Sequence, residues 1–404
     1  MVRLPTDRVP VKRAIVVGAG PSGLAVAACL REQGVPFVVL ERDDCIASLW
    51  QKRTYDRLKL HLPKRFCELP GMKFPDHYPE YPTSPQFISY LQDYATKFDI
   101  TPEFNRTVLS ANYAETSGIW RVRTFVAGTG ETVEYTGHWL VVATGKNAES
   151  VVPGFPGFSD FAGEVIPFSE YTSGEAHRGK SVLVVGCGNS GMEVSLDLCD
   201  HGARPSMVVR DGVHVLPREV LGKSTVELAM ILGRWFPLWI VDKFMVLLSQ
   251  LVLGDLAKLG LRRPAAGPFE LKGTHVRSPV LDNGAVARIR AGDIAVVPAI
   301  SRFNGNQVEF VNGGVLSIDA VVLTGRRSNM PQATWSPPRN GYPRTAFPHG
   351  WNGEYGLYGV GFKHGSLFSA STEAISTAEN IGKAWKKMET EPVAGDGQRI
   401  SIAF

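Results

Sequence analysis

Residues 14–28 read AIVVGAGPSGLAVAA, and residues 182–195 read VLVVGCGNSGMEVS. In both stretches a strand-like apolar run leads into the pattern Gly-x-Gly-x-x-Gly and then into a helix-like segment. The pattern suits a dinucleotide: the first glycine permits a tight turn, the second lets the backbone approach a pyrophosphate, and the third lets the helix pack close to the strand. The N–H groups at the helix N-terminus then face the phosphates. The sequence therefore predicts two dinucleotide-binding loops on one chain.

The first loop has the signature of an adenine dinucleotide with an unphosphorylated ribose. We expect a strand over 14–17, a helix over 21–33 that ends at Gly34, and a second strand, PFVVLE, that ends at Glu41. An acid about 20 residues beyond such a loop binds ribose hydroxyls. The ligand is then FAD or NAD, and the residues expected to bind it are Gly18, Ala19, Gly20, Pro21, Ser22, Gly23 and Glu41.

The second loop predicts a different dinucleotide. It lies between a strand at 181–185 and a helix at 190–200, and the next strand, PSMVVR, ends in Arg210 instead of an acid. A guanidinium fork suits the 2′-phosphate of NADP, whereas an acid repels it. The alternative is an arginine that caps a helix or faces solvent. The residues expected to bind NADP are Gly186, Cys187, Gly188, Asn189, Ser190, Gly191 and Arg210.

The order of these patterns predicts an inserted domain. A strand at 138–145 is followed by the Pro/Gly-rich run at 151–158, a crossing linker, and the similar strand pattern at 318–329 indicates the return crossing. A final strand at 353–362 and a helix at 369–385 then complete the first unit. We therefore expect an α/β fold of two Rossmann-like dinucleotide-binding domains, with the NADP domain inserted in a discontinuous FAD domain. The expected bounds are 1–164 and 318–404 for the FAD domain and 165–317 for the NADP domain. With FAD and NADPH on one chain, the protein is an NADPH-dependent flavoprotein.

Composition narrows the class of protein further. The net charge of +4 and the absence of a basic run with interleaved aromatics argue against nucleic acid as a partner. The five cysteines are an odd number without a CxxC pair, which argues against a disulfide framework, a bound metal and a dithiol redox centre. The N-terminus lacks the apolar core of a secretory signal, so we expect a cytoplasmic protein.

One apolar stretch, residues 235–254, stands out. Asp242 and Lys243 interrupt it, and its longest uncharged run, 244–254, is shorter than the roughly 18 residues needed to span a bilayer. No membrane-spanning segment is predicted. The stretch is interpreted as a helix that is buried or faces a second copy in a homodimer. Contact with a membrane surface, such as the cytosolic face of the endoplasmic reticulum, is an alternative, as is the lining of a substrate entrance.

Beyond these patterns, the chain resembles the plant flavin-containing monooxygenases of the YUCCA group over nearly its whole length. The glycine loops are shared by many flavoproteins, but two stretches are much more specific: KLHLPK at 59–64 and HVLPREVLGKST at 214–225. The resemblance implies oxidative decarboxylation of indole-3-pyruvate to the auxin indole-3-acetic acid, with FAD, NADPH and O₂. The partners would be a small keto acid and O₂.

The resemblance also suggests two residues near the flavin. In the wider family an asparagine six residues after a tyrosine lies beside the flavin ring, and counting from Tyr55 places His61 at that position. His61 is therefore the candidate catalytic residue, with a loop histidine bonded to backbone as the alternative. Trp50 stands where the family has a tryptophan beside the flavin, although a tryptophan that only packs would look the same.

Two departures from the family pattern fall on the crossings. The linker motif FxGxxxHxxxY appears as FAGEVIPFSEY, with Pro167 in place of histidine. The later ATGY appears as LTGR, with Leu323 and Arg326 as the changed residues. Besides the auxin-forming reaction, two functions stay open: a monooxygenase of amines or sulfides, and a weakly active cofactor-binding homologue. A disulfide reductase would need a cysteine pair that the sequence lacks.

Overall fold

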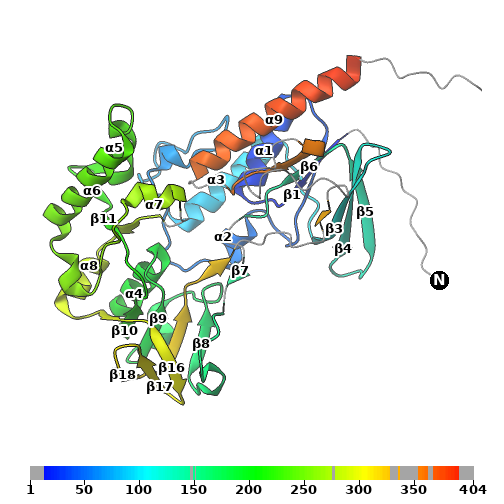
Figure 1. Ribbon diagram of the computed structural model, residues 1–404. Helices are drawn as coiled ribbons and strands as arrows, with labels where there is room; N and C mark the ends of the chain where they lie inside the picture. The colour runs from blue at the N-terminus through cyan, green and yellow to red at the C-terminus, as the bar shows by residue number, and fades with distance from the viewer. Residues whose placement is uncertain are drawn as a thin grey trace, which may run out of the picture.

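The computed structural model describes residues 13–145, 149–150, 152–274, 278–327, 335–336, 354–362 and 367–390. Within them the chain forms two parallel sheets, each with a glycine loop at its centre (Figure 1). The first unit holds both the start and the end of the described chain, in blue and red, and the second holds its middle, in green and yellow (Figure 1). The two Rossmann-like sheets predicted from the sequence are confirmed.

The first sheet has the strand order β2-β1-β6-β22, and all its pairs are parallel. These strands are short and apolar on both faces because both faces are covered. Their bounds are β1 Ala14–Val17, β2 Phe37–Leu40, β6 Trp139–Val142 and β22 Leu357–Gly359. The predicted strand at 14–17 is confirmed, and the second strand ends one residue before Glu41.

Helices cover one face of this sheet, and a smaller sheet covers the other; we call it the antiparallel sheet because its three long strands pair antiparallel, although the short β21 pairs parallel to β3. The helical layer holds α1, α3 and α9, and α1 and α9 pack along each other (Figure 1). On the opposite face Ile15 and Val142 pack against Trp120 of the antiparallel sheet. The bounds are α1 Pro21–Glu32, α2 Ser48–Lys52, α3 Ser84–Lys97 and α9 Leu367–Thr390 for the helices, and β3 Arg106–Ala114, β4 Ile119–Val126, β5 Thr132–Gly137 and β21 Trp335–Ser336 for the strands.

The second sheet repeats the plan with the order β15-β10-β9-β19-β8, again all parallel. Strand β9 corresponds to β1 of the first unit, and helix α4 corresponds to α1. The bounds are β8 Glu164–Pro167, β9 Ser181–Val185, α4 Asn189–Asp200, β10 Arg204–Val208, β15 Ala295–Val297 and β19 Ala320–Leu323.

Smaller elements surround this sheet. They are β11 Val215–Pro217, β12 Glu219–Val220, β13 Lys223–Ser224, α5 Thr225–Leu232, α6 Leu238–Leu253, α7 Pro268–Thr274, β14 Val280–Asp282, α8 Ala285–Ala291, β16 Ile300–Asn304, β17 Gln307–Phe310 and β18 Val315–Ser317. No helix in the described ranges is long and apolar enough to cross a membrane.

The two crossings between the units run side by side. Strands β7 (Glu149–Ser150) and β20 (Arg326–Arg327) pair antiparallel, so the outgoing and returning chain meet at one place (Figure 1). The domain bounds expected at 164/165 and 317/318 both differ from those that the sheets and their packing indicate. Strand β19 pairs with β9 and β8 in the second sheet, so the return crossing follows Leu323. On the outgoing side, Phe155 and Phe158 already pack on Phe303 of the second unit.

A segment of the first unit is built into the core of the second. Tyr55 and Leu58 belong to the same buried cluster as Val182 and Val194, and the Tyr55 ring lies 5.7 Å from that of Phe168. The Asp56 N–H also donates to the carbonyl of Thr172 at 2.9 Å. These contacts, made by residues directly before KLHLPK at 59–64, join the two units.

Candidate functional site

The first loop has little room for side chains at its first and third glycines. Gly18 has φ +105°, and a Cβ there would lie 2.6 Å from the Ala143 carbonyl oxygen. A Cβ on Gly23 would overlap the carbonyl oxygen of Gly18, since the helix packs directly on the turn. By contrast, a Cβ on Gly20 would meet nothing within 4 Å. The middle glycine therefore borders open space, which is where a pyrophosphate needs close access to the backbone.

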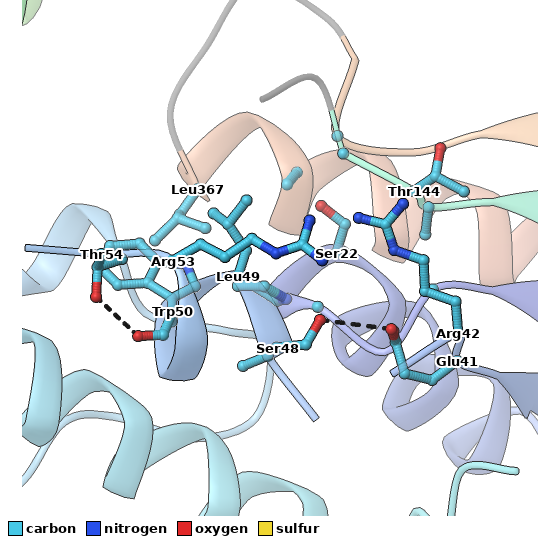
Figure 2. A pocket seen from close by; sticks show the side chains of 18 of the residues that line it. Ser22, Glu41, Arg42, Ser48, Leu49, Trp50, Arg53, Thr54, Thr144 and Leu367 are labelled. Carbon is cyan, nitrogen blue, oxygen red and sulfur yellow. Dashed lines mark hydrogen bonds between the residues drawn. The ribbon is translucent and has the colours of Figure 1, made fainter. Parts of the chain in front are cut away.

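Glu41 lies under this loop and is held by its backbone. Its side chain is only 6% exposed, and one carboxylate oxygen accepts a hydrogen bond from the Ala19 N–H at 2.7 Å. The other oxygen accepts from the Asp43 N–H at 3.1 Å and from the Ser48 hydroxyl at 3.4 Å (Figure 2). The acid predicted from the sequence thus lies beside the loop in a fixed orientation.

A cavity of about 800 Å³ opens from the first loop. The side chains of Arg42 and Arg53 extend over the loop near Ser22 and Thr144, which brings positive charge to the mouth of the turn (Figure 2). Leu367, in the first turn of α9, also lines the cavity. The cavity reaches the second unit, because Ser190 and Thr324 are part of its wall.

Trp50 and His61 both line this cavity. Trp50 packs edge-on against Phe87, with the ring centroids 4.6 Å apart, and the Thr54 hydroxyl donates to its carbonyl at 2.9 Å (Figure 2). His61 is half-buried in the cavity wall. Burial, and secondarily the charge of Arg218, lowers the pKa of His61 to about 4. The imidazole is therefore neutral at physiological pH.

Arg218 fixes the loop that carries His61. Its guanidinium donates to the Leu60 carbonyl at 2.8 Å and to the Asn283 side-chain oxygen at 2.9 Å. It also stacks over the Tyr81 ring at 3.6 Å from the centroid. The sequence patterns predict no role for Arg218. The only signal was that it lies in one of the two family-specific stretches, and the structure shows that this stretch contacts the other.

The second loop repeats the geometry of the first. Gly186 has φ +123°, and a Cβ there would overlap the Thr324 hydroxyl, which donates to the Val185 carbonyl at 2.8 Å. A Cβ on Gly191 would overlap the Gly186 carbonyl oxygen, whereas one on Gly188 would meet nothing within 4 Å. Asn189 is tied to the neighbouring strand, because its side-chain oxygen accepts from the Leu281 N–H at 2.9 Å.

Arg210 borders a second cavity, of about 570 Å³, together with Cys187 and Gly188. The arginine follows β10 by two residues, and its side chain is 75% exposed; among the described residues it pairs with the neighbouring Asp211 at 3.1 Å. Such an exposed pair is weak, so the guanidinium is available to a phosphate. The structure brings Arg210 to the same cavity as the second glycine loop.

The two cavities fit two dinucleotides. Each has a loop whose middle glycine borders open space, each loop leads into the N-terminus of a 12-residue helix, and each has a charged residue at the end of the next strand. The charges are opposite: Glu41 suits ribose hydroxyls, and Arg210 suits a phosphate.

The changed linker residues fit into the fold. Pro167 is the last residue of β8, the edge strand of the second sheet. The Phe168 N–H donates to the Leu323 carbonyl at 3.0 Å, so the backbone nitrogen of Pro167 points away from β19 and loses no ladder bond. Leu323 is 1% exposed in the core. The backbone of Arg326 is in β20, and its side chain lies outside the described part of the chain.

Comparisons with known proteins place the chain in a family. The model of the family described as flavin-binding monooxygenase-like matches residues 11–331. The chain is 59% identical over 398 residues to the probable indole-3-pyruvate monooxygenase YUCCA9 of Arabidopsis thaliana, covering 96% of this chain and 94% of that protein. It is 60% identical over 385 residues to the probable indole-3-pyruvate monooxygenase YUCCA8 of the same plant, covering 94% and 90%. Among solved structures, a steroid monooxygenase bound to NADP aligns with a TM-score of 0.71 at 16% identity, covering 94% and 86%. The chain belongs to the flavin-binding monooxygenase-like family and, within it, to the plant YUCCA group.

Proposed function

We propose that the protein is an NADPH- and O₂-dependent flavin monooxygenase that converts indole-3-pyruvate to indole-3-acetic acid and CO₂. The observation that carries the proposal is the wall of the first cavity, which holds the first glycine loop together with Ser190 and Thr324 of the second unit. A donor held by the second loop can therefore reach an acceptor held by the first. The substrate follows from the named activity of the YUCCA relatives.

In this proposal FAD occupies the first cavity and NADPH the second. FAD would be held by Gly18, Ala19, Gly20, Pro21, Ser22, Gly23, Glu41 and Trp50, and NADPH by Gly186, Cys187, Gly188, Asn189, Ser190, Gly191 and Arg210. All of the first set except Ala19 and Gly23 line the first cavity, and Gly186, Cys187, Gly188 and Arg210 of the second set line the second. Bound together, the two cofactors supply hydride transfer and the activation of O₂, and the protein supplies binding and orientation. Glu41 would hold the ribose, and Arg42 and Arg53 would offset phosphate charge.

The role proposed for His61 is that of a neutral hydrogen-bonding group in the cavity wall. With its pKa near 4, the imidazole can donate one hydrogen bond and accept another without adding a positive charge. Arg218 would keep it in place through the adjacent Leu60 carbonyl. We place the enzyme in the cytoplasm, with the cytosolic face of the endoplasmic reticulum as the alternative.

The proposal is tested with the purified yellow holoprotein. It is reduced anaerobically with NADPH and then mixed with oxygenated buffer and indole-3-pyruvate, and indole-3-acetic acid and hydrogen peroxide are quantified. We expect indole-3-acetic acid in amounts that match the NADPH consumed. Reduction followed by hydrogen peroxide alone would contradict the auxin assignment.

A panel with amine and sulfide substrates separates the alternatives. Turnover of an amine or sulfide, with none of the keto acid, would keep the monooxygenase and replace its substrate. Failure of NADPH to reduce the flavin would instead favour a weakly active homologue, and would point to the crossings that contain Pro167 and Arg326.

A further inference from the structure

The first cavity is lined by several permanent positive charges, and they are not equivalent. A keto acid needs one of them, because a carboxylate that leaves water for a cavity must find a partner. We call the part of the cavity bordered by Ser190 and Thr324 of the second unit the shared end. Within the described part of the wall the lysines and arginines are Arg42, Arg53, Lys59 and Arg106.

Arg42 and Arg53 belong to the first glycine loop. Both guanidinium groups extend over the loop, near Ser22 and Thr144 (Figure 2). Each also lies near a carboxylate oxygen of Asp43, at 3.6 Å for Arg42 Nε and 3.9 Å for an Arg53 Nη. The proposed function uses both arginines for the phosphates of FAD, so neither is assigned to a substrate.

Arg106 is held by its own sheet. Its Nε donates to the Tyr135 hydroxyl at 3.0 Å and lies 3.5 Å from the Glu103 carboxylate. Its backbone N–H donates to the Glu41 carbonyl at 2.8 Å, which places Arg106 beside the acid expected to bind the ribose. This arginine is therefore at the ribose part of the cavity and already has partners.

Lys59 lies near the shared end. Tyr55 and Leu58, which precede it, pack in the core of the second unit. Its charge also acts on α4, the helix that contains Ser190: burial raises the pKa of the Glu193 carboxyl, and Lys59 is one of the cations whose charge opposes this increase. Both observations place Lys59 close to the helix of the second loop.

The ammonium group of Lys59 is available to a ligand. The residue is exposed, and none of the ion pairs among the described residues involves it. The nearby acids of α4 are paired with Arg57 instead, whose guanidinium nitrogens lie 2.9 Å from an Asp200 oxygen and 3.9 Å from a Glu193 oxygen. Lys59 is thus a cation in the cavity wall without an acid of its own in the described structure.

Lys59 and His61 share one side of an extended segment. Hydrogen bonds of 2.9 Å join the Leu58 carbonyl and the Leu60 N–H to the chain at 82–84. Side chains alternate between the two sides of such a segment. Since Leu58 and Leu60 are buried, Lys59 and His61 lie on the other side, and both line the cavity. An ammonium group and a neutral imidazole therefore border the same space.

We propose that Lys59 binds the carboxylate of the keto acid substrate at the shared end of the first cavity, beside His61. The inference rests on the proposed function, because it requires a keto acid as the substrate. A hydrogen bond between an ammonium group and a carboxylate is roughly twice as strong as one between neutral groups. The site therefore selects 2-oxo acids over their uncharged esters and over neutral ketones.

The test compares K59M, which removes the charge but keeps a long unbranched side chain, with K59R and with the control K52M. Lys52 is a lysine of α2 that pairs with Asp44 and is not part of the cavity wall. We expect the KM for indole-3-pyruvate to rise roughly tenfold or more in K59M, to be largely restored in K59R and to be unchanged in K52M. The KM for NADPH and the anaerobic rate of flavin reduction should stay the same in all three, which shows that the fold and the cofactor sites are intact.

Equilibrium binding to the oxidised holoprotein tests the role of the charge without turnover. The flavin absorbance is followed while indole-3-pyruvate or its methyl ester is added. The wild type should bind the acid roughly tenfold or more tightly than the ester, and K59M should bind the two alike.

The inference is overturned if K59M keeps the wild-type KM and affinity for indole-3-pyruvate. It is also overturned if K59M raises the KM for NADPH alone, because Lys59 then contacts the nicotinamide cofactor. Failure of the proposed function is seen separately, as a wild-type protein that oxidises NADPH and forms no indole-3-acetic acid. In that case the titration decides: a preference for the acid that K59M abolishes supports the role of Lys59, and a wild type without this preference contradicts it.

Discussion

Arg210 and Glu41 occupy matching positions in the two units but have opposite charge and opposite exposure. Glu41 is 6% exposed and bonded to its own loop, whereas the Arg210 side chain is 75% exposed. A buried acid is held by backbone donors before any ligand arrives, and an exposed arginine is free to turn toward a phosphate. Both positions follow from the sequence, because they are fixed by the spacing between a glycine loop and the end of the next strand.

The specificity of the second loop can be measured at Arg210. We expect R210Q to raise the KM for NADPH roughly tenfold or more, since a charge-assisted hydrogen bond contributes about 1.5–3 kcal/mol. The KM for NADH should stay the same. Steady-state NADPH and NADH oxidation gives both constants, and R204Q, an exposed arginine at the other end of β10, is the matched control. Equal KM changes for the two nucleotides would contradict a contact between Arg210 and the 2′-phosphate.

The lowered pKa of His61 predicts an acid-sensitive contribution to stability. In the unfolded chain a histidine has a pKa of about 6.5, and in the folded protein that of His61 is about 4, so the unfolded state binds more protons between these values. The contribution of His61 to the free energy of unfolding is fully present above pH 6.5 and is lost as the pH falls toward 4. Its total is roughly 3 kcal/mol at 1.36 kcal/mol per pKa unit.

The variant H61Q should lack this pH dependence. Urea unfolding at pH 7.5 and pH 5 should therefore show a smaller loss of unfolding free energy for H61Q than for the wild type. His177 and His214, whose pKa values burial also lowers, titrate in both proteins and cancel in the comparison. An identical loss in the two proteins would show that the His61 pKa is not depressed.

At the scale of elements, the glycine loops and their helices were predictable because their constraints are local. The helix predicted over 21–33 is observed at Pro21–Glu32, and the one predicted over 190–200 at Asn189–Asp200. In each case the steric limits within a single turn determine the loop and the start of the helix. The three glycines of each loop look alike in the sequence, but the structure shows that they have different neighbours.

The variants G20A and G23A should separate ligand binding from folding. A Cβ on Gly20 meets no protein atom within 4 Å, so G20A should leave the thermal stability of the apoprotein nearly unchanged and lose FAD affinity. A Cβ on Gly23 would overlap the Gly18 carbonyl, so G23A should destabilise the fold by several kcal/mol, on the order of the cost of overpacking. Thermal unfolding of the apoprotein and fluorescence titration with FAD measure the two effects. FAD affinity that survives in G20A would argue against a phosphate at that glycine.

At the scale of the whole molecule, the contacts between the units come from residues far apart in the sequence. Arg218 of the second unit donates to the Leu60 carbonyl of the first, and Arg57 pairs with Asp200 at 2.9 Å. The insertion of the second unit was predicted from repeated strand patterns. Its bounds shifted because strand β19 is recognised as part of the second sheet only through its pairing with β9 and β8.

The contact made by Arg218 should affect the rate at which NADPH on the second unit reduces the flavin on the first. The variant R218K keeps the charge but loses the fork that reaches both Leu60 and Asn283. We expect anaerobic reduction of the flavin by NADPH to slow roughly tenfold or more, because a hydrogen bond from a charged donor is worth about 1.5–3 kcal/mol. FAD affinity should change little. Stopped-flow absorbance measures the rate, and R204K serves as the control; an unchanged rate would limit Arg218 to packing.

By itself, the sequence determined the two glycine loops, the strands and helices that flank them, and the opposite charges of Glu41 and Arg210. These features depend on backbone geometry within a few turns, which glycine and strand spacing encode directly. Only the tertiary structure decided that the segment around Tyr55 packs in the second unit, that Arg218 fixes the loop of His61, and that several apolar side chains of α6 are exposed. Such contacts join residues that are distant in the chain, and their partners are selected by shape and burial that no local pattern specifies.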